Sequence, residues 1–114
     1  MGDCLFCKIA EGEISSGLVY SDEQVVAFKD IHPQAPVHLV VIPRRHLSRV
    51  SEVGEDDAQL MGNLVVVANQ LARKFNVVES GYRLVVNCNA GAGQSVFHLH
   101  LHLLGGRPMR WPPG

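Results

Sequence analysis

The sequence predicts an α+β fold built on a five-stranded, mostly antiparallel sheet. Five short apolar segments have the length and composition of strands, whereas only residues 55–75 show helical periodicity over a long stretch. Strands and helices do not alternate along the chain, which disfavours a parallel sheet with crossover helices. A chain of 114 residues, 46% of them hydrophobic, predicts a single globular domain over residues 1–114.

The N-terminal part of the chain predicts a short helix, a hairpin and a loop. Residues 4–10 fit one or two helical turns, which a glycine ends. Residues 18–20 and 25–28 are predicted to be two short strands around a polar turn. Residues 30–36 contain two prolines that cannot donate to a sheet, so this segment predicts a loop.

A central strand and the long helix follow. Residues 38–43 are apolar almost throughout, which is typical of a central strand, and Pro43 ends it. The helix predicted over residues 55–75 begins with acidic residues and ends with basic ones, an arrangement that suits the helix dipole. Its apolar residues recur at helical spacing and predict one buried stripe, made of Leu60, Leu64, Val67, Leu71 and Phe75.

The C-terminal part predicts two more strands, joined by a glycine-rich loop. Residues 81–89 form the fourth predicted strand, residues 89–95 the loop and residues 97–104 the last strand. In this last strand histidines alternate with apolar residues, so a period of two places them on opposite faces. The face predicted to point at the core consists of Phe97, Leu99, Leu101 and Leu103. Residues 105–114 hold three prolines and predict an irregular tail.

Three histidines, His98, His100 and His102, share the other face of this strand. They span about 13 Å at roughly 3.3 Å per residue, so one small metal ion cannot reach all three. The row therefore predicts a division of labour along an extended substrate. A neutral imidazole is an available nucleophile near pH 7 if a hydrogen bond holds its proton on one nitrogen. We expect the central His100 to be that nucleophile.

The loop before the histidine strand is a candidate phosphate site. Gly91 and Gly93 permit outward-facing backbone amides, and such nests bind phosphate oxygens. Gln94 and Ser95 are expected to add side-chain donors at its lip. Two glycines before a strand are also compatible with a simple turn, but beside the histidine row the phosphate cradle is the preferred interpretation.

A Cys-x-x-Cys pair near the N-terminus has the spacing of half a tetrahedral zinc site. Cys4 and Cys7 would need two further ligands, for which His46 and His98 are candidates. The alternative is a pair of small apolar residues on a helical turn. Cys88, in the fourth strand, is expected to be a buried small residue.

Two further residues are candidates for binding. Asp30 begins the proline loop, where an exposed carboxylate can accept the hydroxyl groups of a ribose. Trp111 lies in the proline-bounded tail and is expected either to cover the site or to anchor an interface.

Composition and charge narrow the classes of partner. The net charge is −1, and the only basic cluster, residues 44–46, is too short to predict a nucleic-acid interface. No segment is long and apolar enough to span a bilayer, and no secretion signal is present, so we expect a cytoplasmic protein without a membrane partner. An odd number of cysteines argues against a disulfide framework.

Residues 98–104 match the pattern His-φ-His-φ-His-φ-φ, in which φ is apolar, and in this they resemble the histidine triad (HIT) family of nucleotide hydrolases and transferases. The resemblance extends over almost the whole chain. Its ending, residues 104–107 and 111–114, is similar to the Hint branch of that family. Other matching segments are Phe6-x-Lys8-Ile9, Phe28-x-Asp30-Ile31, Pro33-Gln-Ala-Pro-x-His38, Val41-Ile-Pro-x-x-His46, Gly81-Tyr-Arg and Gly93-Gln-Ser.

The resemblance implies a fold, an assembly and an activity. It implies five antiparallel strands with one long and one short helix, paired as a homodimer into a ten-stranded sheet. It also implies hydrolysis of purine nucleoside phosphoramidates, such as adenosine 5′-phosphoramidate and AMP-lysine-like substrates, to the purine nucleotide (AMP or GMP) and an amine. No cofactor is required for catalysis in this scheme.

The resemblance further implies roles for individual residues. His100 is the nucleophile that forms a nucleotidyl-histidine, and the carbonyl of His98 orients it. His102 and the amides around Ser95 hold the phosphate, Ser95 assists the leaving amine, and His38 completes the histidine cluster. The implied nucleotide-binding residues are Leu5, Phe6, Ile9, Phe28, Asp30, Ile31, Asn87, Gly93, Gln94, Ser95, His100 and His102.

Zinc-binding relatives in the family resemble this chain in its cysteine pair. They imply a structural zinc ion on Cys4, Cys7, His46 and His98. Three alternatives remain open at this point. They are a dinucleoside polyphosphate hydrolase or nucleotidyl transferase of the same family, a nucleotide-binding regulatory protein with vestigial catalysis, and a hydrolytic zinc enzyme with His98 and His100 as ligands.

Overall fold

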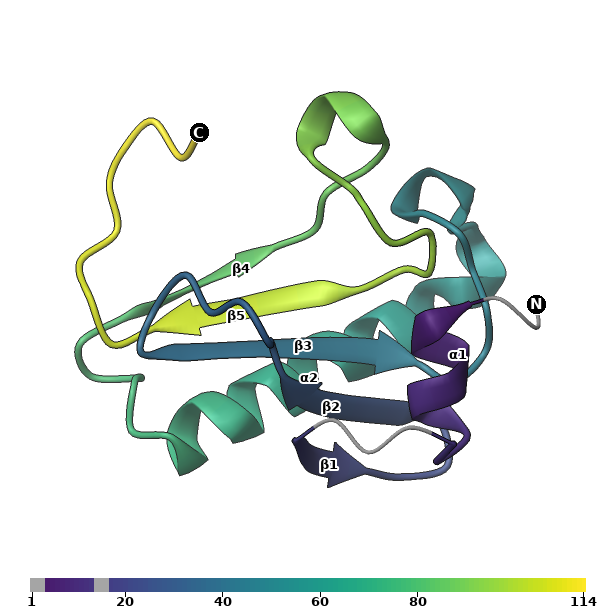
Figure 1. Cartoon of the computed structure of the whole chain (residues 1–114), viewed down its shortest axis with the longest axis horizontal. Coiled ribbons are helices and arrows are strands. Elements are labelled where there is room, and N and C mark those ends of the chain that lie inside the picture. The colour runs from purple at the N-terminus through teal and green to yellow at the C-terminus, as the bar shows by residue number, and fades with distance from the viewer. Residues whose placement is uncertain (1–3, 14–16) are drawn as a thin grey trace.

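The computed structural model describes residues 4–13 and 17–114 and places one long helix behind a five-stranded sheet (Figure 1). Every neighbouring pair of strands is antiparallel, in the order β1-β2-β3-β5-β4. This confirms the predicted α+β fold. The elements are α1 (Leu5–Ala10), β1 (Leu18–Ser21), β2 (Val25–Lys29), β3 (Val37–Pro43), α2 (Ala58–Lys74), β4 (Tyr82–Val85) and β5 (Leu101–Gly105).

The two faces of the sheet carry different layers. Alternate residues of β2 illustrate this, because Val25 and Ala27 join the main core with α2, whereas Val26 and Phe28 pack with α1 on the other side. Helix α1 covers only one end of its face, as Figure 1 shows. The rest of that face, over β3 and β5, stays open. The predicted stripe of α2 faces the core, with Leu64, Val67 and Leu71 buried and Leu60 and Phe75 partly buried.

The helix and the last two strands are shorter than the sequence predicts. Residues 55–57 form a separate 3-10 turn, in which the Asp57 carboxylate accepts from the amide of Gly54 and from Arg45. Strand β4 ends at Val85 instead of residue 89. Strand β5 begins only at Leu101, because the amide of Leu99 donates to the carbonyl of Leu47 at 2.6 Å and so leaves the sheet ladder.

Phe97 does not face the core, contrary to the prediction. Its side chain is 43% exposed, and the Arg49 guanidinium lies 5.2 Å from the centre of its ring. Phe97 lies in the loop before β5, and the alternation of side chains between the two faces of the sheet holds only from His98 onward. Leu99, Leu101 and Leu103 are buried as predicted.

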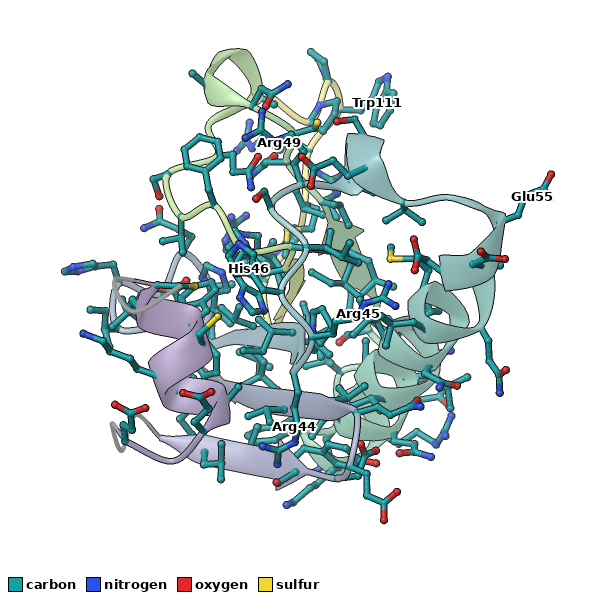
Figure 2. All side chains as sticks on the ribbon, turned by 90° about the vertical axis from the view of Figure 1, so that its right-hand side faces the viewer. Arg44, Arg45, His46, Arg49, Glu55 and Trp111 are labelled. Carbon is teal, nitrogen blue, oxygen red and sulfur yellow. The ribbon has the colours of Figure 1, made fainter. Side chains whose placement is uncertain are left out.

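Figure 2 labels the three residues of the short basic cluster after β3, residues 44–46, and both arginines of this cluster bind other groups of the protein. Arg44 donates to the carbonyls of Ala10 and Asp22, and Arg45 pairs with Asp57. These contacts connect the end of α1 and the start of α2 to the sheet. In the ranges that the structure describes, no helix has the length and hydropathy needed to cross a membrane.

Candidate active site

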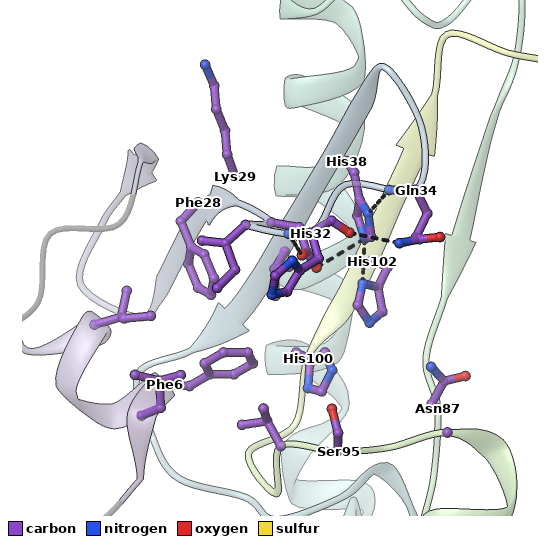
Figure 3. Close-up of a pocket in the computed structure, with 17 residues that line it drawn as sticks. Phe6, Phe28, Lys29, His32, Gln34, His38, Asn87, Ser95, His100 and His102 are labelled. Carbon is purple, nitrogen blue, oxygen red and sulfur yellow. Dashed lines mark hydrogen bonds and ion pairs between the residues drawn. The ribbon is translucent and has the colours of Figure 1, made fainter.

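A cavity of about 500 Å³ lies on the open face of the sheet and holds most of the predicted site (Figure 3). Its apolar end is formed by α1 and β2, including Phe6 and Phe28, whose rings meet edge to face at 5.3 Å. Its polar end is formed by β3, β5 and the loop before β5. The predicted residues that line it are Leu5, Phe6, Ile9, Phe28, Asp30, Ile31, His38, Asn87, Gly93, Ser95, His100 and His102.

The histidine row is divided between two places. His100 and His102 line the cavity, whereas His98 is fully buried and does not. All three imidazoles nevertheless project from the same face of the sheet, as predicted. His98 and His100 both contact Phe6 of α1 on that face, and the intervening leucines pack in the core with α2. His98 contributes to the cavity through its backbone carbonyl, which contacts the ring of His100.

That carbonyl fixes the tautomer of His100. The Nδ1 atom of His100 lies 2.7 Å from the carbonyl oxygen of His98, so we assign the proton to Nδ1, which donates it. The lone pair then sits on Nε2, where a substrate in the cavity can meet it. The ring is held laterally by Phe6, edge to face at 5.1 Å between centres. In this tautomer His100 presents a ring nitrogen with a free lone pair to the cavity.

A second chain of hydrogen bonds fixes the tautomer of His102. The amide of Gln34 donates to His38 Nδ1 at 3.0 Å, so His38 carries its proton on Nε2. This Nε2–H donates to His102 Nδ1 at 2.9 Å, which leaves the proton of His102 on its own Nε2. Burial, together with the charges of His100 and His38, lowers the pKa of His102 to about 4. His102 is therefore a neutral donor near pH 7.

Asp30 sits beside this chain at the mouth of the cavity. Its Oδ1 accepts from the amide of His32 at 2.8 Å, and its Oδ2 lies 3.4 Å from His38 Nε2. Burial lowers the pKa of His38 despite the carboxylate, so the two groups form a neutral–anion contact and not an ion pair near pH 7. The remaining lone pairs of the carboxylate are available to hydroxyl donors.

Asp30, His38 and His102 also have the composition of a metal site, with ligand atoms within 4.8 Å of one another. The hydrogen bonds argue against that use. Because Gln34 donates to His38 Nδ1, Nε2 of His38 keeps its proton and has no lone pair for an ion.

The loop before β5 meets the cavity through Gly93 and Ser95. Gly93 ends a 3-10 turn over Ala90–Ala92 with φ +92°, a left-handed conformation that favours glycine. Gln94 does not lie at the lip, contrary to the prediction. Its amide nitrogen donates to the carbonyl of Ser48 at 2.8 Å and its oxygen accepts from the amide of Asn89 at 2.8 Å. Gln94 is buried and anchors the loop. Gly91 also lies outside the cavity lining.

Five lining residues were not singled out as site residues from the sequence. Gln34 could have been predicted from the sequence, because it lies four residues before His38 in a proline-rich loop. Such a loop must fold back on the strand that follows it. His32, beside Asp30, had none. The five are Lys29, His32, Gln34, Val40 and Val96.

The four predicted zinc ligands lie together behind the cavity. His98 Nδ1 is 3.4 Å from the Sγ atoms of both Cys4 and Cys7. His46 Nδ1 is 3.3 Å from Cys7 Sγ and 3.1 Å from His98 Nδ1. A tetrahedral zinc ion with bonds of about 2.0–2.3 Å separates such ligand atoms by roughly 3.3–3.8 Å. The three sulfur–nitrogen distances lie in this range, and the distance between the two nitrogens is slightly shorter, so the donor set fits with a small adjustment.

The outer hydrogen bonds agree with this assignment. His98 Nε2 donates to the carbonyl of Pro43 at 2.8 Å, so its Nδ1 lone pair faces the thiols. Burial and the neighbouring Cys4 thiol raise the pKa of Cys7 to about 11.

All three cysteines are free, and Cys88 is half-buried where a buried residue was expected. Trp111 is 84% exposed and lies outside the cavity lining.

Comparison with known proteins identifies the fold family. The HIT domain model matches residues 11–109. An uncharacterised HIT-like protein of Synechocystis is 46% identical over 112 residues, which cover 98% of this chain and 97% of that protein. The purine nucleoside phosphoramidase of Escherichia coli is 44% identical over 107 residues, covering 94% and 90%.

A solved structure agrees closely in three dimensions. The crystal structure of a HIT family hydrolase from Legionella pneumophila superposes with a TM-score of 0.97 at 53% sequence identity, covering 98% of this chain and 100% of that one. The paired histidines at the end of a cavity, the family model and this superposition lead to one conclusion. The chain belongs to the HIT family.

Proposed function

We propose that the protein hydrolyses purine nucleoside phosphoramidates through a nucleotidyl-histidine on His100. The observation that carries the proposal is the contact between His100 Nδ1 and the His98 carbonyl, because it leaves the Nε2 lone pair of His100 free at the cavity. The similarity to the E. coli phosphoramidase supports the choice of the phosphorus–nitrogen bond as the one cleaved.

The nucleoside would occupy the apolar end of the cavity. Phe6 and Phe28 offer an aromatic edge and face to a purine, and Leu5, Ile9 and Ile31 complete an apolar rim. Asp30, at the border with the polar end, would accept the ribose hydroxyls. In this order the α-phosphorus would lie next to His100.

The phosphoryl oxygens would meet donors that are already oriented. His102 presents Nε2–H because Nδ1 is occupied by His38, and the loop presents the amides around Ser95. Donors fixed before the reaction stabilise developing negative charge without reorganisation in the transition state. Asn87 lines the same end and can add an amide donor.

The chemistry then proceeds in two displacements. First, the Nε2 lone pair of His100 bonds to phosphorus and the phosphorus–nitrogen bond breaks. The departing nitrogen takes the proton of the Ser95 hydroxyl, which in turn takes a proton from solvent water. Second, a water oxygen bonds to phosphorus, the bond from phosphorus to Nε2 breaks, and the water proton goes to solvent. The His98 carbonyl stabilises the positive charge that His100 carries between the steps.

Trapping the intermediate tests this function. Protein quenched during turnover of adenosine 5′-phosphoramidate should carry one adenylate, and fragmentation should place it on His100. Slow turnover of this substrate beside fast turnover of diadenosine polyphosphate would instead assign the chain to the dinucleoside polyphosphate hydrolases of the family. Nucleotide binding without any adduct or turnover would indicate a regulatory protein.

We also propose a structural zinc ion on Cys4, Cys7, His46 and His98. The donor set and the hydrogen bond from His98 to Pro43 support it. The ion would tie α1 to the end of β3 and to the segment before β5. It leaves His100 free, which argues against a hydrolytic zinc enzyme.

A homodimer joined at the β4 edge is a further part of the proposal. Strand β4 is the last strand of the sheet, and an open edge of this kind pairs readily with a second copy. Helix α2 exposes Val65 (41%) and Val66 (51%), which are helical neighbours of Asn69. The Asn69 side chain accepts a hydrogen bond from Tyr82 of β4, so these two valines lie near the β4 edge. Such pairing would give the ten-stranded sheet.

Light scattering tests the dimer. The parent should have twice the mass of one chain, and Val66→Glu should shift it toward a monomer. Leu18→Glu, at the opposite β1 edge, is the matched control and should remain dimeric. A cytoplasmic location remains our expectation, supported by three free cysteines.

A further inference from the structure

A second cavity adjoins the active site on the far side of His102. Its volume is about 270 Å³, and it shares Gln34, His38, Asn87 and His102 with the first cavity. The strand register explains how β4 reaches it. Val85 lies opposite His102 and Arg83 lies opposite Leu104, so Arg83 projects on the same face of the sheet as His102.

Two arginines give this second cavity a positive character. Arg83, from β4, and Arg107, from the start of the tail, both line it, and its lining contains no Asp or Glu. The remaining walls consist of the two histidines shared with the first cavity, two side-chain amides, two aliphatic side chains and two tail residues, Met109 and Pro113. The cavity therefore presents two positively charged side chains to a ligand and no carboxylate that would compete for them.

Neither guanidinium is neutralised by a carboxylate within residues 4–13 and 17–114. Arg83 donates to the carbonyl of Arg110 at 2.9 Å. Arg107 donates to the carbonyls of Gln34 at 2.9 Å and Pro108 at 3.0 Å. A guanidinium has five N–H donors, so each keeps donors for a ligand while its carbonyl contacts hold it in place.

The order of groups along the two cavities predicts what would enter the second one. The apolar end by α1 suits the nucleoside, and the phosphorus must lie next to His100. A substrate extended past His102 then places its leaving group toward Arg83 and Arg107. This direction rests on the function proposed above, because it assumes that the nucleoside occupies the first cavity.

We propose that Arg83 and Arg107 form a leaving-group subsite that selects amines carrying an anionic oxygen group. A carboxylate, as in the phosphoramidate of an amino acid, and a phosphate share this chemistry. Both accept paired donors from guanidinium groups. The subsite would raise the turnover of such conjugates relative to neutral ones of the same size.

The test compares three adenosine phosphoramidates at low ionic strength. Their leaving amines are 4-aminobutyrate, its neutral carboxamide, and 3-aminopropylphosphonate. The measured quantity is kcat/KM for each acid divided by kcat/KM for the carboxamide. We expect this ratio to be about fivefold larger in the parent than in Arg107→Gln, as for one partly exposed ion pair. Dividing the two ratios cancels the intrinsic difference between the leaving groups.

Matched variants separate the subsite from general charge effects. Arg73→Gln removes the same charge from the last turn of α2, on the opposite side of the sheet, and should keep the parent ratio. Arg107→Lys should restore part of the preference because it keeps the charge without the paired donors. Arg83→Gln should act in the same direction as Arg107→Gln.

The parent alone supplies a test that does not depend on folding of a variant. Its preference for the acids should shrink as salt rises from about 0.01 to 1 M, since salt screens exposed charges. Equal preference for acid and carboxamide in the parent at every salt concentration would overturn the subsite. A preference for the phosphonate over the carboxylate would assign it to phosphate-bearing leaving groups, and the reverse to amino acids.

Adenosine 5′-phosphoramidate itself, whose leaving group is ammonia, distinguishes the two levels of the proposal. Its turnover without any preference among the acids would overturn the subsite and keep the proposed function. Failure to turn over any phosphoramidate would overturn both.

Discussion

The carbonyl oxygen of His98 accepts the Nδ1 proton of His100 at 2.7 Å, while the imidazole of His98 is turned away from the cavity toward Cys4 and Cys7. One residue therefore contributes its main chain to the candidate nucleophile and its side chain to the candidate zinc site. The two sites are separate in chemistry but share a peptide unit. Four predictions follow from this arrangement and from the cavity around it.

Replacing the nucleophile should abolish turnover and spare binding. We expect His100→Asn to lower kcat for adenosine 5′-phosphoramidate by about a thousandfold or more, since loss of a nucleophile removes the covalent route. Calorimetry should find AMP affinity within about fivefold of the parent, because the base and ribose contacts are kept. A variant that retains even a tenth of the parent rate would remove His100 from that role.

Ser95 should matter most for poor leaving groups. Ser95→Ala should slow phosphoramidates of strongly basic alkylamines by roughly 10²-fold, because these need a proton as they depart. Conjugates of weakly basic aromatic amines should slow by much less. The measurement is a plot of log kcat against leaving-amine pKa for the parent and the variant, and parallel lines would contradict the role.

The stability of the protein should fall as the pH drops from 6.5 toward 4. Burial lowers the pKa of His102 to about 4, below the value of about 6.5 for an unfolded histidine. Between these two pKa values His102 is protonated in the unfolded chain but not in the folded protein. The free energy of unfolding therefore decreases as the pH falls through this window. His102 alone contributes at most about 1.4 kcal/mol per pH unit.

His102→Asn isolates this contribution. The variant should show a shallower decrease of Tm between pH 6.5 and 4 than the parent. The difference between the two curves cancels the contributions of titrating groups that do not contact His102. Superimposable slopes would show that His102 titrates normally in the folded protein.

Loss of a zinc ligand should lower metal content and stability together. Cys4→Ser should reduce bound zinc well below one ion per chain, measured by mass spectrometry of the metal, and should lower Tm. Cys88→Ser is the matched control, since Cys88 lies outside the four-residue cluster, and it should keep its zinc. If Cys4→Ser binds as much zinc as the parent, the proposed zinc site is contradicted.

Local periodicity predicted most of the fold but could not predict where the strands end. The stripe of α2 and the apolar run of β3 are properties of the segments themselves, and both elements were confirmed. The late start of β5 depends on the contact of Leu99 with Leu47, which lies in another part of the chain. A period of two cannot reveal such a contact, and Phe97 was placed in the core for that reason.

In the candidate site, too, local sequence features could be predicted, whereas contacts between distant parts of the chain could not. Its side chains at the cavity, such as Asp30 and His102, were found because their spacing or residue type is unusual. Gln94 was predicted at the lip of the cavity because a side-chain amide beside glycines can donate to a phosphate. In the structure this amide binds three backbone groups instead, and the sequence does not distinguish the two cases. Arg83 and Arg107 belong to segments that match the family pattern, but no role was predicted for either. The sheet register that places Arg83 opposite Leu104, on the same face as His102, could not be predicted from the sequence.

The contact that prepares His100 comes from a peptide oxygen, and every amino acid supplies one. The identity of residue 98 is consequently free to drift as far as the reaction is concerned, provided that the backbone keeps its path. In this chain the imidazole of His98 contacts the two cysteines at the start of the N-terminal helix and the carbonyl of Pro43. A lineage that dispensed with the cysteines could exchange the first imidazole of the triad without disturbing the second.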